Sequence, residues 1–153
     1  MVARTNVASQ TDTIYAISAA LPATYDAAGY GSTAMTYTTI GKMQSVTPHG
    51  SKRPINVWTP IAGPAEKTKG TPDYGNMDMV FGDVPTDAGQ VIVKAAEASP
   101  NHYSLKITYS DGEIHYLDIL VASFEYSGGA AGDAKTVTAQ SGICKAPVIV
   151  PAP

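Results

Sequence analysis

The alternation of apolar and polar residues is most regular between residues 76 and 126, where it predicts a strand, a helix and two further strands. Met77, Met79 and Phe81 alternate with polar or smaller neighbours, which is the two-residue period of a half-buried strand. The same period returns over residues 103–109. We therefore expect two amphipathic strands of one sheet, separated by a helical segment.

The helix between these strands is predicted over about residues 87–98. Thr86 or Asp87 can cap its free backbone amides, and a carboxylate in the first turn suits the positive end of the helix dipole. Pro100 ends the helix, because proline disfavours helical geometry in the residue before it. The apolar face expected to pack on the sheet consists of Val91, Ile92, Ala95 and Ala98.

The Asp111-Gly112 pair predicts a two-residue hairpin turn, followed by a long strand over residues 113–126. The middle of this strand is apolar on both faces, so we expect it to lie between a second sheet and the helix. Asp118 interrupts the apolar pattern. We predict a bulge that turns its side chain outward, since the alternative, a buried catalytic acid, needs a partner that the sequence does not supply.

The rest of the chain is organised more loosely. Three further strands are predicted, at residues 12–18, 35–46 and 135–141. Gly41 is expected to mark a bulge or a close backbone approach, and Gly142 is expected to end the last strand. Residues 21–33 predict a loop because they contain several helix and strand breakers. Residues 1–10 predict a polar arm that is ordered only by contact.

Residues 47–74 form a long connection that contains five prolines and four basic residues. Its middle, Ile55–Trp58, is predicted to be a short strand that carries the only tryptophan. Long connections within one domain are usually functional or mobile. Two interpretations stay open: the basic residues contact an acidic partner surface, or the segment is a flexible, solvated hairpin.

Composition limits the function more than it limits the fold. A chain of 153 residues is long enough for one domain with a core. Its net charge of −3 argues against a protein that grips nucleic acid electrostatically. Only 15% of the residues are charged, a low share that is common where neighbouring subunits cover the surface. No apolar run approaches membrane length, and no secretion signal is apparent, so we expect folding in a cytoplasm.

The residue types used in catalysis occur without a catalytic pattern. His49, His102 and His115 lie far apart in the sequence, without metal-ligand spacing, and we expect each to be a surface side chain. Cys144 is the only cysteine, so no intrachain disulfide can form. No histidine lies near Cys144 in the sequence to activate its thiol, and no glycine-rich phosphate loop precedes a helix. We therefore expect no enzymatic activity, no cofactor and no metal.

Several short segments between Tyr37 and Pro147 form an ordered pattern. They are the helix start Asp87-Ala88-Gly89-Gln90, the strand start Tyr103-Ser104-Leu105, the Asp-Gly turn, the pair Phe124-Glu125 and the closing segment KTVTAQSGICKAP. In this order the chain resembles the tail tube (major tail) proteins of long-tailed bacteriophages. The resemblance implies a mainly β fold over residues 1–153, a β-sandwich or barrel-like tail tube domain flanked by one helix.

The function that the resemblance implies is structural. Six copies would close into a ring, and rings would stack into the hollow tail tube through which DNA is ejected. The partners would be the protein itself and the tape measure, tail terminator and distal tail proteins, with no membrane. DNA would pass through the lumen without specific binding. The subunit would assemble in the host cytoplasm and reside in the virion tail.

The resemblance also suggests roles for particular residues. Residues 47–74 would be the inter-ring loop, with contact candidates Lys52, Arg53, Trp58, Lys67 and Lys69. A negatively charged lumen would repel DNA phosphates, and the candidate acids are Asp78, Glu113, Asp118 and Glu125. The C-terminal tail, residues 144–153, would dock on a neighbour through Val148, Ile149 and Val150. Pairing of this tail along the edge of its own sheet is the alternative.

Two other functions stay open. The first is a tube subunit of a related bacteriocin or secretion apparatus, which would have the same fold. The second is a monomeric β-sandwich that binds carbohydrate or protein. In that case aromatic residues in loops would form a binding platform, namely Trp58, Tyr25, Tyr30 and Tyr74.

Overall fold

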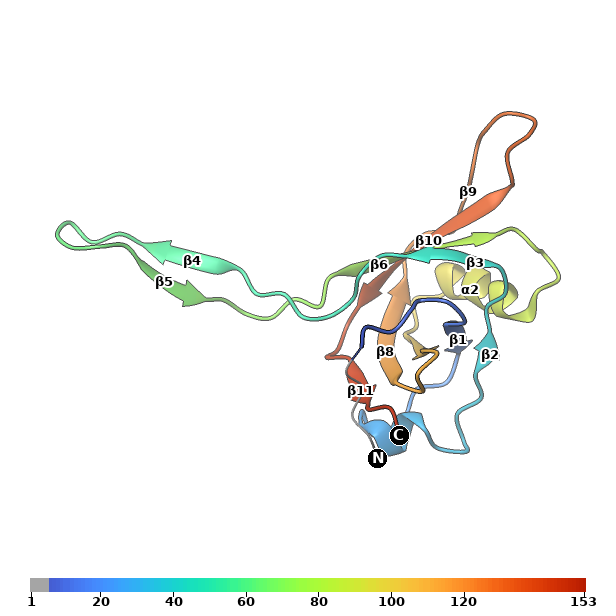
Figure 1. Cartoon of the computed structure of the whole chain (residues 1–153), viewed down its shortest axis with the longest axis horizontal. Helices are drawn as coiled ribbons and strands as arrows, with labels where there is room; N and C mark the ends of the chain where they lie inside the picture. Colours follow the sequence, from blue (N-terminus) through green and yellow to red (C-terminus); the bar gives the residue numbers. More distant parts are fainter. Residues whose placement is uncertain (1–5) are drawn as a thin grey trace.

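A large antiparallel sheet forms the body of the protein in the computed structural model, which describes residues 6–153 (Figure 1). Its nine strands are β1 (Ile14–Ser18), β2 (Thr38–Thr39), β3 (Met43–Val46), β6 (Asn76–Gly82), β7 (Tyr103–Thr108), β8 (Ile114–Val121), β9 (Glu125–Tyr126), β10 (Thr136–Ile143) and β11 (Val148–Val150). Two further strands, β4 (Ile55–Trp58) and β5 (Glu66–Lys69), pair only with each other among the described residues. The helices are α1 (Ala27–Tyr30) and α2 (Ala88–Ala98).

The sheet curls until its two edges meet. Its strand order is β2-β1-β7-β8-β10-β6-β3, so β2 and β3 are the outermost strands. Only residues 40–42 separate these strands in the sequence. Backbone bonds on either side of the connection hold it in place, from Ile40 N–H to the Tyr15 carbonyl (2.8 Å) and from Gly82 N–H to the Lys42 carbonyl (2.9 Å). The predicted mainly β, barrel-like fold is confirmed, with one continuous sheet supplying both layers.

The inward faces of the strands form the core. The predicted alternation is confirmed in β6, whose Met77, Met79 and Phe81 are fully buried. The fully buried apolar residues of the other strands are Ile17, Leu105, Ile107, Leu117, Ile119, Val137 and Ala139. Because strand side chains alternate between faces, the strands give an apolar row to this interior, while β7 and β8 also bury Ser104, Tyr116 and Asp118 on their other face.

Helix α2 packs across the sheet with a different face from the one predicted. Its buried residues are Gly89, Gln90, Val93 and Ala96, whereas Val91 of the predicted face is 52% exposed. The reason lies at its start. Asp87 caps the helix as predicted, and its carboxylate also accepts a hydrogen bond from Gly41 N–H (3.1 Å).

The close approach of α2 to the β2–β3 connection depends on two glycines. A Cβ atom at Gly89 would overlap the backbone of Thr39, and one at Gly41 would press on the Asp87 carboxylate. The predicted close approach at Gly41 is confirmed. These contacts place the first turn of α2 against the backbone of the β2–β3 connection. The predicted apolar face of the helix is therefore rotated away from the core.

The hairpin between β7 and β8 has a three-residue loop, so the predicted two-residue turn was wrong. Tyr109 N–H donates to the Glu113 carbonyl (2.9 Å), and Gly112 N–H donates to the Tyr109 carbonyl (3.0 Å). Gly112 alone in this turn has a positive φ, of 92°. This is a type I turn completed by a left-handed glycine.

Two other boundaries also differ from the predictions. Gly142 lies inside β10, because it pairs with Leu120 on one side and with Asn76 on the other. The predicted loop over residues 21–33 contains α1, which Asp26 caps through a hydrogen bond from Gly29 N–H (2.7 Å). The helical turn was missed because it is only four residues long.

The N-terminal arm predicted for residues 1–10 lies partly outside the described residues. Of residues 6–10, all but Ala8 are exposed. The hydroxyl of Ser110 lies 3.4 Å from the Ser9 carbonyl, close to the β7–β8 turn. In residues 6–153 we find no helix with the length and apolar character needed to cross a membrane.

Candidate functional site

A hairpin arm, residues 52–73, projects away from the body and is the most distinctive surface feature (Figure 1). Its base is closed by Lys52 and Asp73, whose backbone groups bond in both directions (2.7 and 2.6 Å). Further out, β4 and β5 pair from Ile55–Lys69 to Trp58–Glu66. The predicted short strand at Ile55–Trp58 is therefore confirmed.

The pairing register gives the arm two different faces. Side chains directly opposite in an antiparallel pair share a face, so Ile55 and Val57 lie with Lys69 and Lys67. The other face carries Trp58 opposite Glu66, and Asn56 opposite Thr68. One face is thus aliphatic and basic, and the other presents the only tryptophan among polar groups.

No part of the described chain covers this arm. All eight residues of β4 and β5 are exposed, including Ile55 (56%), Val57 (59%) and Trp58 (62%), and Ile61 near the tip is fully exposed. A two-stranded hairpin alone in water is marginally stable at best. Apolar side chains gathered on such an element indicate a surface that is covered by a partner.

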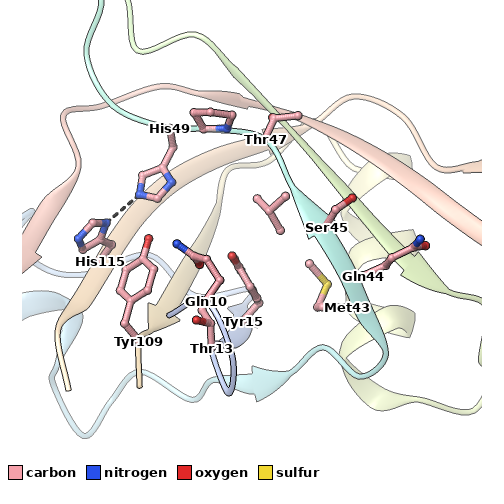
Figure 2. A pocket seen from close by; sticks show the side chains of 12 residues that line it. Gln10, Thr13, Tyr15, Met43, Gln44, Ser45, Thr47, His49, Tyr109 and His115 are labelled. Carbon is pink, nitrogen blue, oxygen red and sulfur yellow. Dashed lines mark hydrogen bonds between the residues drawn. The ribbon is translucent and has the colours of Figure 1, made fainter. Parts of the chain in front are cut away.

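An open pocket of about 640 Å³ lies where the arm leaves the body (Figure 2). It lies between the N-terminal turn, β1, β3 and the ends of β7 and β8. Its lining includes Gln10, Thr13, Tyr15, Met43, Tyr109, His49 and His115. His49 belongs to the root of the arm and His115 to the body, so this pocket is the point where the two regions meet.

The two histidines at this root are partly buried and contact each other, which corrects the prediction that each is a surface side chain. His49 Nε2 lies 2.8 Å from His115 Nδ1, and His115 Nε2 lies 2.6 Å from the Glu113 carboxylate. The Tyr109 ring packs edge-on against His115. Burial, with a contribution from His115, lowers the pKa of His49, so the pair favours the neutral form of that ring.

Asp118 is buried, and the strand pairing at this residue is regular. The predicted bulge and outward orientation were therefore wrong. It is 1% exposed and pairs in register with Ser104. His102 Nδ1 lies 2.8 Å from its carboxylate. The partner that the sequence did not reveal thus comes from the turn after α2, 16 residues away. A buried acid cannot line an open lumen, which removes Asp118 from the wall candidates.

The other three candidate acids do not form one cluster. Asp78 and Glu125 lie opposite Gln140 and Thr138 of β10, and therefore share the outer face of the sheet. Glu113 lies at the far end of β8, where it bonds to His115. A role of any of these acids in a lumen stays a prediction.

The C-terminal tail pairs with its own sheet, the alternative given for it above. Val148, Ile149 and Val150 of β11 lie opposite Tyr116, His115 and Ile114 of β8. The side chain of Ile149 remains 55% exposed. Docking of this exposed edge on a neighbouring copy stays a prediction.

The four aromatic residues of the alternative sugar-binding platform are not gathered on one surface. Tyr30 is 1% exposed and stacks on Tyr116 at 5.1 Å, where it completes a small core outside the main sheet. Trp58 lies on the arm, away from α1 (Figure 1). The proposed platform is therefore wrong.

Comparison with known proteins finds similarity in fold. No family model matches the sequence, and no curated protein does. The sheath/tube terminator of an extracellular contractile injection system, PVC, in its extended state has a TM-score of 0.69 at 10% identity, covering 97% of this chain and 100% of that one. The SPP1 tail tube has a TM-score of 0.66 at 12% identity, covering 94% of this chain and 78% of that one.

A third similar structure comes from a symmetric assembly. A chain of the six-fold symmetrised baseplate of the anti-feeding prophage has a TM-score of 0.63 at 6% identity, covering 99% of both chains. The likeness of these three structures extends over nearly the whole of this chain. The expected resemblance to tail tube proteins is confirmed at the level of the fold.

Proposed function

We propose that this protein is a structural subunit that assembles into the tube of a phage tail or of a related injection apparatus. The observation that carries the proposal is the exposed apolar and basic arm on a body whose fold is that of tube and terminator proteins. The body buries its apolar core within the chain, whereas the apolar residues of the arm are exposed. The arm is therefore the part that needs a partner. A second copy of the same chain supplies one in a self-assembling tube.

The arm is proposed as the contact between successive rings. It carries four basic residues, Lys52, Arg53, Lys67 and Lys69, against two acidic ones, in a chain whose net charge is −3. The remaining surface is therefore acidic on balance, and an arm reaching a neighbouring copy meets charge of opposite sign. Ile55, Val57 and Trp58 would supply the desolvated centre of that contact.

Contacts within a ring are proposed to use the free sheet edges. In the described chain, β9 pairs only with β10 and β11 only with β8, so each leaves one edge unpaired. Strand edges pair readily with other chains, and joining them around a closed ring leaves none exposed. A ring of six copies is supported by the six-fold symmetry of one similar assembly.

In this proposal the stacked rings form a hollow conduit for DNA in the virion tail. The lumen would repel phosphates, with Asp78 and Glu125 on the outer sheet face as wall candidates. Tape measure, terminator and distal tail proteins would be its partners at the inside and at the two ends. The virion location is supported by the similarity in fold to the SPP1 tail tube.

Negative-stain electron microscopy of the purified chain at rising concentration tests this function. Rings or hollow tubes are the expected result. Strictly monomeric particles, also after addition of preformed tube ends as initiators, would contradict it.

A tube terminator is the second candidate, because the sheath/tube terminator of a contractile injection system has a TM-score of 0.69 to this chain. A terminator caps a tube and does not extend it. Single rings that never elongate would favour that role, whereas long tubes would favour the tube subunit.

A further inference from the structure

His102, Asp118 and Cys144 are distant in sequence but meet on one face of the sheet. Ile119 in β8 lies between Tyr103 of β7 and Ile143 of β10, and their side chains share a face. Residues one position away point to the opposite face, because strand side chains alternate. This brings together His102, Asp118 and Cys144.

The three side chains are close enough to coordinate one metal ion. Their candidate ligand atoms all lie within 4.8 Å of one another, and His102 Nδ1 is 2.8 Å from Asp118 Oδ1. Backbone pairing fixes the frame, since Cys144 N–H donates to the Asp118 carbonyl (2.9 Å). Tetrahedral zinc places its ligands roughly 3.3–3.8 Å apart, so a small side-chain rotation completes the set.

One observation is independent of this proximity. Asp118 is 1% exposed, and its second carboxylate oxygen, Oδ2, is buried without a hydrogen-bond partner. An unpartnered carboxylate oxygen removed from water is costly. A cation bound among the three side chains would satisfy it.

We propose that His102, Asp118 and Cys144 form a binding site for one divalent cation of the zinc class. The ligand set of imidazole nitrogen, carboxylate oxygen and sulfur matches the preference of Zn²⁺, a borderline-soft ion, over that of Mg²⁺ or Ca²⁺, which take oxygen ligands. The site offers three ligands from the described chain. Water would complete the coordination, because the His102 side chain is 39% exposed and opens the site to solvent.

Binding would displace the thiol proton of Cys144 to solvent. Burial and the neighbouring Asp118 raise the pKa of this thiol, which favours its protonated form in the absence of a metal ion. Metal ligation requires the thiolate. The ion would link the segments before β7, within β8 and after β10. This structural role is independent of the proposed tube function.

Cobalt(II) titration of the full chain tests the site, because thiolate ligation gives a charge-transfer absorption in the near ultraviolet. We expect that absorption to saturate at one ion per chain and to be displaced by Zn²⁺. At about a hundredfold excess of Zn²⁺ over its Kd, the Tm should rise by about 5 °C or more.

Two ligand variants and one matched control complete the test, with folding checked in chelator. Cys144→Ser should lose the charge-transfer absorption, and His102→Gln should weaken binding by more than about tenfold. His49→Gln, a histidine change in the other cluster, should bind as the unaltered protein does. Absence of the absorption, or its persistence with equal affinity in His102→Gln, would overturn the proposal and leave only a His102–Asp118 pair.

Discussion

The body and the arm of this protein are built from the same antiparallel pairing but differ in what covers them. In the body, Ile119 is fully buried in the hydrophobic core, on a strand paired on both sides. In the arm, Ile55 belongs to an equally regular strand pair and is 56% exposed. Backbone strand pairing is present in both regions, so pairing alone does not distinguish a self-sufficient element from one that needs a partner.

The difference indicates where the stability of each region originates. Burial of apolar area is the main favourable term in folding, and the body has it within one chain. The arm orders about twenty residues, which costs conformational entropy, and buries little in return. We infer that the arm gains its missing burial from another copy, so that its apolar residues are needed for assembly and not for folding.

The largest expected effect comes from replacing isoleucine with aspartate, which should prevent folding in the body but not in the arm. Ile119→Asp places a carboxylate in the core at a cost of several kcal/mol, comparable with the total stability of about 5–15 kcal/mol, so we expect no cooperative thermal unfolding. Ile55→Asp should change the Tm by less than about 2 °C. Circular dichroism melts of the two variants provide the measurement.

Assembly separates the two variants as well. The folded Ile55→Asp chain should fail to stack into tubes at concentrations where the unaltered protein does so. A cooperatively melting Ile119→Asp protein would contradict the account of the core, and normal tubes from Ile55→Asp would contradict the account of the arm.

Substitution of Gln90 should have an intermediate effect on stability, because its side chain connects helix α2 to the body. Its amide accepts from Val84 N–H (2.9 Å) and donates to the carbonyls of Gly41 (2.9 Å) and Gly82 (2.8 Å). Gln90→Leu leaves these three groups without a partner and should lower the free energy of unfolding by about 3 kcal/mol. The neighbouring exposed change Val91→Ala should cost less than about 0.5 kcal/mol. Urea unfolding curves that show equal losses would refute this role.

The smallest effect is expected at the root of the arm. The pKa of His49 is lowered by burial and by His115, so the unfolded chain binds a proton at this residue more readily than the folded one. Stability is therefore unaffected above the ordinary histidine pKa of about 6.5 and falls as the pH drops from there toward the lowered value.

His49→Gln should reduce this loss, since the amide can keep a hydrogen bond to His115 without titrating. The loss of unfolding free energy between about pH 7.5 and pH 5 should be smaller in the variant by up to about 1 kcal/mol. Identical pH profiles would show that His49 remains accessible to protons.

Sequence periodicity predicted the body well because burial there follows the strand repeat. Met77, Met79 and Phe81 occupy the predicted inward row, and Asp87 caps the helix as expected. The arm was recognised from its length, prolines and basic residues, and its strand at Ile55–Trp58 was predicted. These features are local, so a single chain segment contains the information needed to infer them.

The β7–β8 turn and helix α1 were local errors, whereas those in the candidate site and in the packing of α2 arose where contacts join distant segments. Asp118 was predicted to turn outward because its partner His102 comes from another element, and His49 with His115 appeared unrelated for the same reason. The face of α2 was misassigned because Gly89 lets the helix approach backbone, a contact that hydrophobic periodicity does not describe.

Replacement of the arm tests the central claim most directly. Lys52 and Asp73 form a doubly hydrogen-bonded pair, the geometry that a two-residue Asn-Gly turn closes. Replacing residues 53–72 with Asn-Gly should therefore leave the body intact. Sedimentation velocity should show the unaltered protein as rings or larger assemblies and the variant as a folded species that does not stack, with an unchanged Tm. Equal assembly of both proteins, or unfolding of the armless one, would contradict the division of the molecule into a self-sufficient body and an assembly arm.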